Sequence, residues 1–146
     1  MAAPVPPHRK VRLMAVVVDT DVVSFVFKKD TRARLFHRHL VGQALILSFM
    51  TVAELRQWAL RRRWGQASRD RLERHLQVYH IYYADDGLCT LWAEVGDRAR
   101  RRGRAIDVAD AWIAAAALAL GVPLVTHNPA DYAGVDGLTV LSAATP

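Results

Sequence analysis

The chain has 146 residues, the length of one domain with a full hydrophobic core. Its hydrophobic fraction of 52% excludes an intrinsically disordered protein, and its net charge of +6 favours a polyanionic partner such as nucleic acid. Lysine occurs only at Lys10, Lys28 and Lys29, so nearly all of the positive charge comes from arginine. Arginine suits phosphate groups, but the same preference also follows from genome composition.

Cysteine content and hydropathy bear on the compartment. The single Cys89 permits neither an internal disulfide nor a cysteine-based zinc site, so a cytoplasmic setting is the default expectation. The apolar stretch over residues 111–125 is too short to span a bilayer, and we expect no membrane partner. Residues 1–13 contain prolines and basic groups without a signal-peptide core. We predict a disordered extension there, with Met14 as an alternative start, and one domain over residues 14–146.

Apolar runs and helical patterns alternate along this domain. Five apolar runs have the length of strands: residues 15–18, 44–49, 80–84, 123–126 and 138–141. Six segments have the pattern of helices: residues 21–29, 31–40, 52–64, 68–79, 88–102 and 108–120. Glycines are expected between the elements, where helices end: Gly42, Gly65, Gly87, Gly103 and Gly121. The alternation predicts an α/β domain with a central, mostly parallel sheet of four or five strands and helices on both faces.

Three acidic residues stand where apolar segments end. Asp19 follows the first predicted strand, Glu54 comes shortly after the second, and Asp110 lies near the start of the last helix. In an open α/β sheet, ligands gather outside the carboxyl ends of the strands, so distant acids can meet at one edge. Clustered carboxylates repel each other unless a cation joins them. This arrangement predicts a site for a hard metal ion.

Structural roles compete with metal binding at several acids. Thr51 and Glu54 have the spacing of a capping box, which by itself is the better explanation of Glu54. Asp107 fits the N-cap of the last helix, and Asp21 fits the cap of the first. Asp19 alone fits a turn. These alternatives remain open for each acid taken singly.

Asp110 is the acid that a structural role explains least well. It shares a helical stripe with Ile113 and Ala117, and no charged residue follows it up to Leu120. Its carboxylate is therefore expected to face inward, where a charge without a partner is strongly unfavourable. A cation or a buried partner would remove this penalty.

The ordered motifs resemble those of PIN-domain ribonucleases, especially VapC-type toxins. The opening motif corresponds to residues 16–24, the middle motif to residues 50–55, and the last helix and strand to residues 109–128. The resemblance covers residues 15–142. It implies an endoribonuclease that depends on Mg²⁺, with Mn²⁺ as a substitute, and that acts as the toxin of a toxin–antitoxin pair inhibiting translation. We expect hydrolysis of an RNA phosphodiester by a water that the ion activates, leaving 5′-phosphate and 3′-hydroxyl ends.

The resemblance also implies roles for individual residues. Asp19 and Asp110 would be the direct metal ligands, and Glu54 would complete the catalytic pocket. Asn128 occupies a fourth position where some relatives have an acid, and Asp131 is the alternative residue for that role. A second metal ion is therefore in question, since an amide brings no charge. Three hydroxyls are candidates for hydrogen bonds to the ligands or to phosphate: Thr20, Ser24 and Thr126.

Basic and aromatic residues supply candidate RNA contacts. Arginines cluster at residues 61–63 and 98–104, where they also fit solvated helix ends. Arg102 and Arg104 are close enough to Asp107 in sequence to flank the acidic pocket and hold phosphate. Three tryptophans are interpreted as core or dimer contacts: Trp58, Trp92 and Trp112. Three further aromatic residues are candidates for stacking on bases: Trp64, Tyr82 and Tyr83.

The expected partners are an RNA substrate (tRNA, rRNA or mRNA), a cognate antitoxin protein and a second copy of the chain. The apolar segment over residues 22–27 corresponds to a region that the resembled family uses for dimerisation and antitoxin binding. One rival interpretation is a PIN-like module that binds RNA or protein without catalysis, which the amide of Asn128 favours. The less favoured rival is a HAD-type phosphatase using Asp19 and Asp21, with Ser48 and the pair Asp85–Asp86. That rival lacks the lysine its chemistry needs, because no lysine follows Lys29.

Overall fold

The computed structural model describes residues 14–146, so the predicted N-terminal extension lies outside the described residues. These residues form one parallel five-stranded sheet with the order β3-β2-β1-β4-β5. The strands are β1 (Ala15–Val18), β2 (Ala44–Ser48), β3 (His80–Tyr82), β4 (Leu124–Val125) and β5 (Val140–Leu141). The predicted α/β fold is confirmed, and every strand pair is parallel. The strand order changes direction between β1 and β4, which is where an open α/β sheet places its ligand site.

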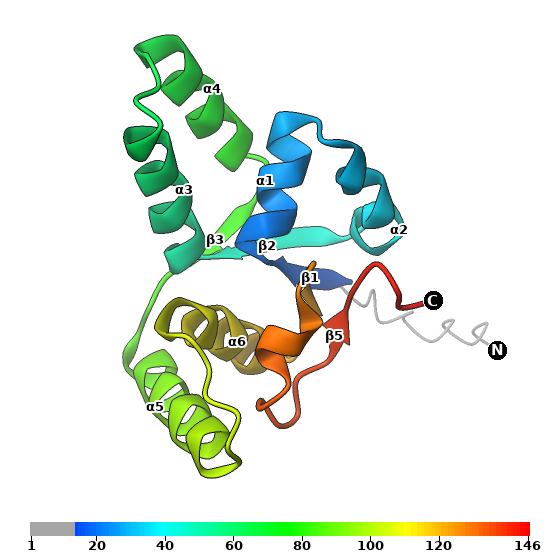
Figure 1. Cartoon of the computed structure of the whole chain (residues 1–146), viewed down its shortest axis with the longest axis vertical. Helices are drawn as coiled ribbons and strands as arrows, with labels where there is room; N and C mark the ends of the chain where they lie inside the picture. Colours follow the sequence, from blue (N-terminus) through cyan, green and yellow to red (C-terminus); the bar gives the residue numbers. More distant parts are fainter. Residues whose placement is uncertain (1–13) are drawn as a thin grey trace, which may run out of the picture.

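Helices cover both faces of the sheet, as predicted (Figure 1). The α-helices are α1 (Thr20–Lys28), α2 (His37–Leu40), α3 (Phe49–Arg61), α4 (Gln66–Leu76), α5 (Asp86–Arg101) and α6 (Val108–Leu120). Two 3₁₀ helices, η1 (Thr31–Leu35) and η2 (Pro129–Tyr132), complete the described elements. The single helix predicted over residues 31–40 is wrong, because η1 ends at Leu35 and α2 begins separately at His37. No helix within residues 14–146 is long and apolar enough to cross a membrane.

Side chains of β1 alternate between two hydrophobic cores. Val16 and Val18 pack with α1, α3 and α4, whereas Val17 packs on the opposite face with α5 and α6. This alternation follows from the two-residue period of a strand. In Figure 1 the first four helices lie above the sheet, and α5 and α6 lie below it. Residues at the carboxyl end of β1 can therefore meet side chains from both layers.

One glycine prediction is wrong, and it concerns the start of α5. Gly87 lies inside the first turn of this helix instead of between elements. The reason is Asp85, whose carboxylate accepts a hydrogen bond from Leu88 N at 2.8 Å and so starts the helix at Asp86. At the other end of the chain, Gly121 has a φ of 64° and ends α6 in the left-handed conformation that glycine tolerates best.

Small side chains bring α6 close to the sheet. Ala114, Ala115 and Ala116 are fully buried, and Ile113 is the large side chain of this helix with no exposure. Because α6 carries Asp110 at its first turn, the packing of Ile113 helps determine where that carboxylate lies.

Replacing Ile113 by alanine should therefore destabilise the fold. We expect Ile113→Ala to lower the free energy of unfolding by about 2–5 kcal/mol, since it leaves a cavity in a packed core. Urea denaturation followed by circular dichroism measures this change. Leu120→Ala, at a position that is 37% exposed, should cost less than about 1 kcal/mol. Equal losses in both variants would contradict the role assigned to Ile113.

Candidate metal centre

The three predicted acids meet in one cavity at the carboxyl end of β1. This acidic cavity has a volume of about 330 Å³. Its lining residues come from four parts of the chain: Asp19, Thr20, Asp21, Ser24, Glu54, Leu55, Trp58, Asp110, Asn128 and Asp131. Glu54 lies on α3, above the sheet, and Asp110 lies on α6, below it. The spatial convergence that the sequence predicts is thus present in the fold.

Asp19 is the most firmly held of these acids. Its side chain is 6% exposed, and its Oδ1 accepts a hydrogen bond from Thr20 N at 2.8 Å. Its Oδ2 accepts two more, from the hydroxyl of Thr126 at 2.7 Å and the hydroxyl of Tyr132 at 2.9 Å. Burial raises the pKa of Asp19 above its ordinary value, and the hydrogen bonds from Thr126 and Tyr132 oppose that rise. The predicted role of Thr126 as a hydrogen-bond donor to a candidate ligand matches this geometry.

Tyr132 connects the two candidate metal ligands. Its hydroxyl lies 2.9 Å from Asp19 Oδ2 and 3.3 Å from Asp110 Oδ1. Burial and the neighbouring carboxylates raise the pKa of Tyr132, so the phenol stays protonated. A single proton cannot satisfy both carboxylates fully, and Asp110 receives the longer contact. Burial and the negative charge of Asp19 raise the pKa of Asp110 to about 7.

The capping role considered for Glu54 is wrong. Ser48 caps α3 by accepting a hydrogen bond from Met50 N at 3.1 Å, so the helix begins before the predicted Thr51. Glu54 instead lies in the second turn, where its Oε1 accepts a hydrogen bond from the hydroxyl of Thr20 at 2.8 Å. That same hydroxyl lies 2.9 Å from the hydroxyl of Thr51. Burial and the charge of Asp19 raise the pKa of Glu54.

Asp21 is a cavity residue that the sequence analysis missed. The cap of α1 is Asp19, and Asp21 lies in the first turn with its Oδ1 accepting from Val22 N at 2.7 Å. Its Oδ2 accepts from the side-chain amide of Asn128 at 2.9 Å. Burial and the charge of Asp19 raise the pKa of Asp21 to about 6. Asp21 thus supplies a carboxylate beside the amide at the fourth position.

A second cavity borders the first on the side of α5 and η2. It has a volume of about 570 Å³ and shares Asp110 and Asp131 with the acidic cavity. Arg104 lines this cavity, whereas Arg102 borders neither one and forms an ion pair with Asp136 at 2.5 Å. Asp107 occupies the N-cap position of α6 without accepting a capping hydrogen bond, and it also lines this cavity. The side chains of Arg104 and Asp107 therefore both border the acid site.

The predicted packing role fits all three tryptophans, and Trp58 also borders the acid site. Trp92 and Trp112 stack at 5.1 Å between ring centroids. Trp58 is partly buried, packs against the hydrophobic core and also lines the acidic cavity, one helical turn beyond Glu54. Its i, i+4 spacing from Glu54 is the sequence signal that would have placed it there.

The HAD-type pattern has no common site in the structure. Ser48 caps α3, and Asp85 caps α5. Neither residue lines the acidic cavity with Asp19. The phosphatase interpretation therefore fails on geometry as well as on its missing lysine.

The acidic cavity fits a hard divalent cation. Five of its lining residues carry carboxylates, and among the described residues no lysine or arginine lines it. Oxygen donors with uncompensated negative charge suit Mg²⁺ or Mn²⁺ better than softer metals. Within residues 14–146 no group of three or more His, Cys, Asp or Glu side chains is arranged to hold an ion. Mg²⁺ commonly takes only one or two carboxylates and keeps several waters, so the pair Asp19 and Asp110 fits its needs.

The raised pKa of Asp110 has a consequence for stability without metal. Its pKa moves from 3.8 to about 7, so the folded protein holds this proton more tightly than the unfolded chain. The stabilisation is full below pH 3.8 and is lost as the pH rises through 7. Asp110→Asn should therefore make the metal-free protein more stable near neutral pH. We expect a gain of roughly 1–2 kcal/mol, because solvent screens this half-exposed group.

Thermal unfolding in EDTA at several pH values between about 5 and 8 measures this effect. The matched control is Asp97→Asn, which alters an exposed ion pair with Arg101 and should change stability by less than about 0.5–1 kcal/mol. A gain for Asp110→Asn that does not grow with pH would contradict the assignment.

Comparisons with known proteins identify the family of this chain. A family model described as PIN domain matches residues 16–138. Ribonuclease VapC1 of Haemophilus influenzae is 26% identical over 127 residues, covering 86% of this chain and 95% of that protein. Plasmid stability protein StbB of Pseudomonas syringae pv. tomato is 32% identical over 136 residues, covering 87% and 96%.

Solved structures share the fold. VapBC2 from Rickettsia felis, bound to a DNA fragment from its promoter, matches with a TM-score of 0.78 at 18% identity over 88% of this chain and 98% of that one. VapBC-1 from nontypeable Haemophilus influenzae matches with a TM-score of 0.72 at 23% identity over 90% and 100%. Because the family model spans most of the described residues, this protein belongs to the PIN domain family.

Proposed function

We propose that this protein is a divalent-metal-dependent endoribonuclease of the VapC type. The observation that carries the proposal is the gathering of carboxylates from α1, α3 and α6 in one cavity that no lysine or arginine of residues 14–146 lines. Similarity to a protein named Ribonuclease VapC1, over 95% of that protein's length, supports RNA as the substrate. The positive net charge of +6 is also consistent with a nucleic acid substrate.

The residues at the acid site have different roles in the proposed hydrolysis. Asp19 and Asp110 would hold the ion, which when bound offsets charge on the attacked phosphate and lowers the pKa of water. Thr126 and Tyr132 hold the carboxylate of Asp19 in one orientation. Glu54 is suited to take a proton from the attacking water, because its raised pKa makes the carboxylate a stronger base. Products would carry 5′-phosphate and 3′-hydroxyl ends.

Two further hydroxyls border the site. Thr20 already donates its hydroxyl proton to Glu54, so its role is to orient that carboxylate. Ser24 lies one turn further along α1 and lines the same cavity, where its hydroxyl is available to a phosphate oxygen. Ser24 is thus proposed as a substrate contact, and Thr20 as a residue that positions Glu54.

The proposal includes protein partners. Matched structures named VapBC suggest an antitoxin as a partner, and cleavage of tRNA, rRNA or mRNA would inhibit translation. A second copy of the chain is supported by an apolar groove of about 370 Å³ between α1, η1, α2 and β2. Val41, which lines this groove, and Leu35, which follows a lining residue in the chain, are 59% and 49% exposed. Such exposed apolar side chains are typical of an interface.

Loss of either metal ligand should abolish cleavage. We expect Asp110→Asn to lower the rate of RNA cleavage by about 10²-fold or more, because the ion would lose a charged ligand. EDTA should abolish cleavage by the unaltered protein, and Mg²⁺ or Mn²⁺ should restore it. Gel analysis of end-labelled tRNA and rRNA measures both effects, with Asp97→Asn as the control. Full activity in EDTA would exclude the mechanism.

Metal binding separates this proposal from the non-catalytic alternative. The amide of Asn128 favoured that alternative, but it donates to Asp21, which adds a carboxylate to the cavity. Calorimetric titration with Mn²⁺ should therefore show binding to the unaltered protein and weaker binding to Asp110→Asn. Absence of binding at millimolar concentration would favour a module without catalysis.

Arg104 and Arg102 should differ in their effect on RNA binding. Arg104 lines the cavity next to the acids, whereas Arg102 is engaged with Asp136. We expect Arg104→Ala to weaken RNA binding and to lower the slope of log affinity against log salt by about 0.7, the value for one phosphate contact on a single strand. Fluorescence anisotropy with labelled RNA measures the slope. Arg102→Ala should leave it nearly unchanged, and equal slopes for both variants would contradict this distinction.

A further inference from the structure

Two helices border the acidic cavity with matching stripes of side chains. On α1 and its end, Thr20, Ser24 and Lys28 follow each other at intervals of four residues. On α3 and its C-cap, Glu54, Trp58 and Arg62 do the same. Residues at this spacing lie on one face of a helix, so each stripe covers about 12 Å from its first to its last residue.

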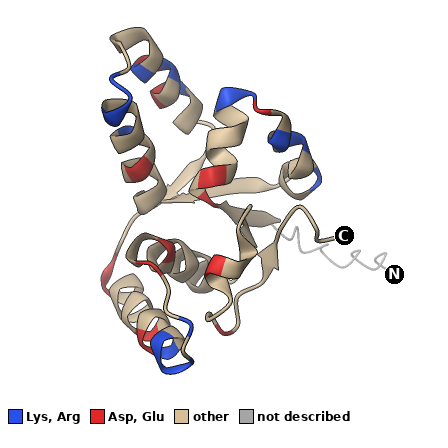
Figure 2. Ribbon diagram, in the orientation of Figure 1, with Lys and Arg blue, Asp and Glu red and all other residues tan. Residues whose placement is uncertain are grey.

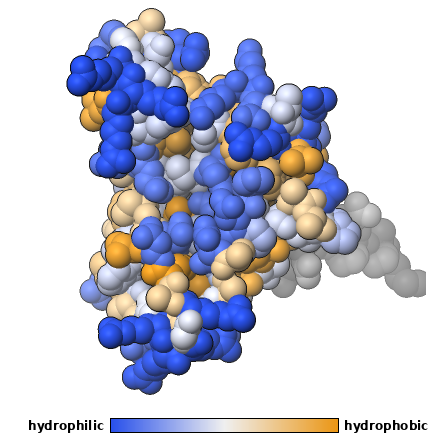
Figure 3. Space-filling view, in the orientation of Figure 1, coloured by the Kyte–Doolittle hydropathy of each residue, from blue (hydrophilic) through white to orange (hydrophobic). Residues whose placement is uncertain are grey.

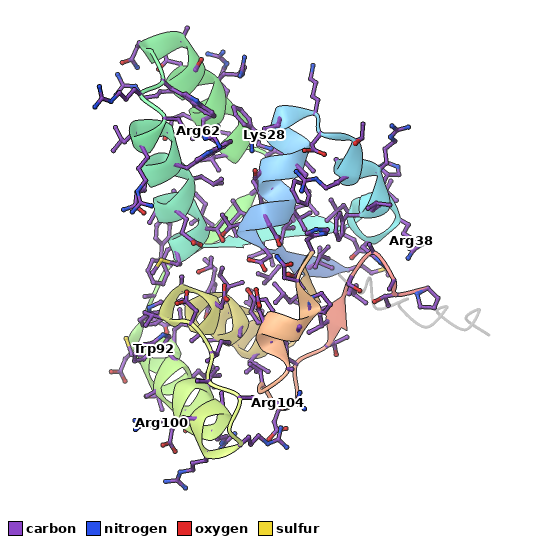
Figure 4. All side chains as sticks on the ribbon, viewed as in Figure 1. Lys28, Arg38, Arg62, Trp92, Arg100 and Arg104 are labelled. Atoms are coloured by element: carbon purple, nitrogen blue, oxygen red, sulfur yellow. The ribbon has the colours of Figure 1, made fainter. Side chains whose placement is uncertain are left out.

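The two stripes face each other at both ends. At the cavity, the hydroxyl of Thr20 donates to Glu54 Oε1 at 2.8 Å. At the far end, Lys28 Nζ lies 4.4 Å from the ring centroid of Trp58, and Arg62 Cζ lies 5.6 Å from the same centroid. Figure 4 shows Lys28 and Arg62 beside each other between α1 and α3. The facing surfaces therefore change from acidic at the cavity to cationic at the helix ends.

Figure 2 shows the same change on the ribbon, with acidic residues in the lower parts of α1 and α3 and basic residues where both helices end. In Figure 3 the most hydrophilic side chains gather over the α3–α4 end of the molecule and over the end of α5. The cationic end thus lies on the side of the acids away from Arg104, which Figure 4 places near the end of α5.

Lys28 and Arg62 have no acidic partner within residues 14–146. Asp30, two residues after Lys28, is already held by Arg32 through contacts of 2.8 and 3.1 Å. Helix C-termini favour cations in general, which accounts for two basic residues near the ends of α1 and α3. It does not account for both of them lying over one indole ring that also lines the acidic cavity.

Trp58 links the cations to the cavity. Its indole is packed at its edges by Phe27 and Trp64, with centroid distances of 6.5 and 4.7 Å. A ring held in this way offers a fixed surface for cation–π contacts, which orient a lysine and an arginine from different helices. Because both cations lie close to the same ring, an anion beside that ring would be attracted by both positive charges.

We propose that Lys28 and Arg62 form a phosphate-binding pair for single-stranded RNA, and that Trp58 positions both cations beside the acidic cavity. This inference rests on the proposed function. A scissile phosphate at the acids would leave a phosphate further along the strand near the pair, about 12 Å away along α1 and α3. The commitment to RNA follows from this order of charges, with acids at the cavity and cations at the far ends of the same two helices.

The test compares two double variants that lose the same charge. Lys28→Gln/Arg62→Gln removes the pair, whereas Arg38→Gln/Arg74→Gln removes two exposed cations that do not border the acidic cavity. Glutamine keeps much of the aliphatic stem and its packing. Binding of a fluorescent single-stranded RNA is measured by anisotropy in EDTA at several salt concentrations, so that binding is read without cleavage.

We expect the Lys28/Arg62 variant to bind RNA about tenfold more weakly and to lower the salt slope by up to about 1.4, since each phosphate that is no longer neutralised accounts for about 0.7. The control should change neither quantity appreciably. Trp58→Leu, which keeps both charges, should also lower the slope, and an unchanged slope would overturn the positioning role of Trp58. Equal decreases in the two double variants would overturn the pair, because they would reflect net charge alone.

Other outcomes separate this inference from the proposed function. Unchanged RNA affinity of the Lys28/Arg62 variant, with normal metal-dependent cleavage, overturns the pair and leaves the nuclease assignment intact. Unchanged RNA affinity with abolished binding of a cognate antitoxin assigns the surface to that protein and also overturns the inference. If the unaltered protein neither binds nor cleaves RNA, both proposals fail.

Discussion

The hydroxyl of Tyr132 lies between Asp19 at the end of β1 and Asp110 on α6, and the acid site depends on this contact. It brings two carboxylates into one small volume, where burial and repulsion raise the pKa of Asp110 to about 7. In the part of the chain that the structure describes, no lysine or arginine lines that cavity to offset the charge. A divalent ion is the partner that such an arrangement stabilises most, and the site can hold it because its donors are all oxygen.

The topology explains why this site forms where it does. β1 and β4 are neighbours in the sheet although more than a hundred residues separate them in the chain, and their carboxyl ends place Asp19 beside Thr126. Helices from both layers then add Glu54 from one side and Asp110 from the other. Cationic side chains lie to two sides of the acids, with Lys28 and Arg62 over Trp58 at the ends of α1 and α3 and Arg104 in the adjoining cavity after α5. This charge order suits a polyanion that crosses the acidic centre.

Local sequence patterns predicted a residue's role correctly where one interaction dominates. They predicted it wrongly where several polar side chains compete for the same helix cap. The stripe containing Asp110 correctly indicated an inward-facing acid, because an uncharged helix has few ways to pack. Thr51 and Glu54 also matched the capping-box motif. Ser48 is nevertheless the N-cap of α3, so the helix begins before Thr51. Asp21 was taken for a cap, whereas Asp19 fills that position and leaves Asp21 to bind Asn128. Each error arose because neighbouring polar residues compete for the same backbone donors.

The sequence by itself determined the class of fold, the parallel sheet and the three acids that converge, since hydrophobic period and strand-end positions are local properties. Tertiary structure alone decided that Tyr132 joins Asp19 to Asp110, and that Trp58 borders the acidic cavity as well as the core. It also separated Arg104, which borders the acids, from Arg102, which pairs with Asp136. These contacts join residues on different elements, and their distances depend on how helices pack across both faces of the sheet, which no local pattern encodes.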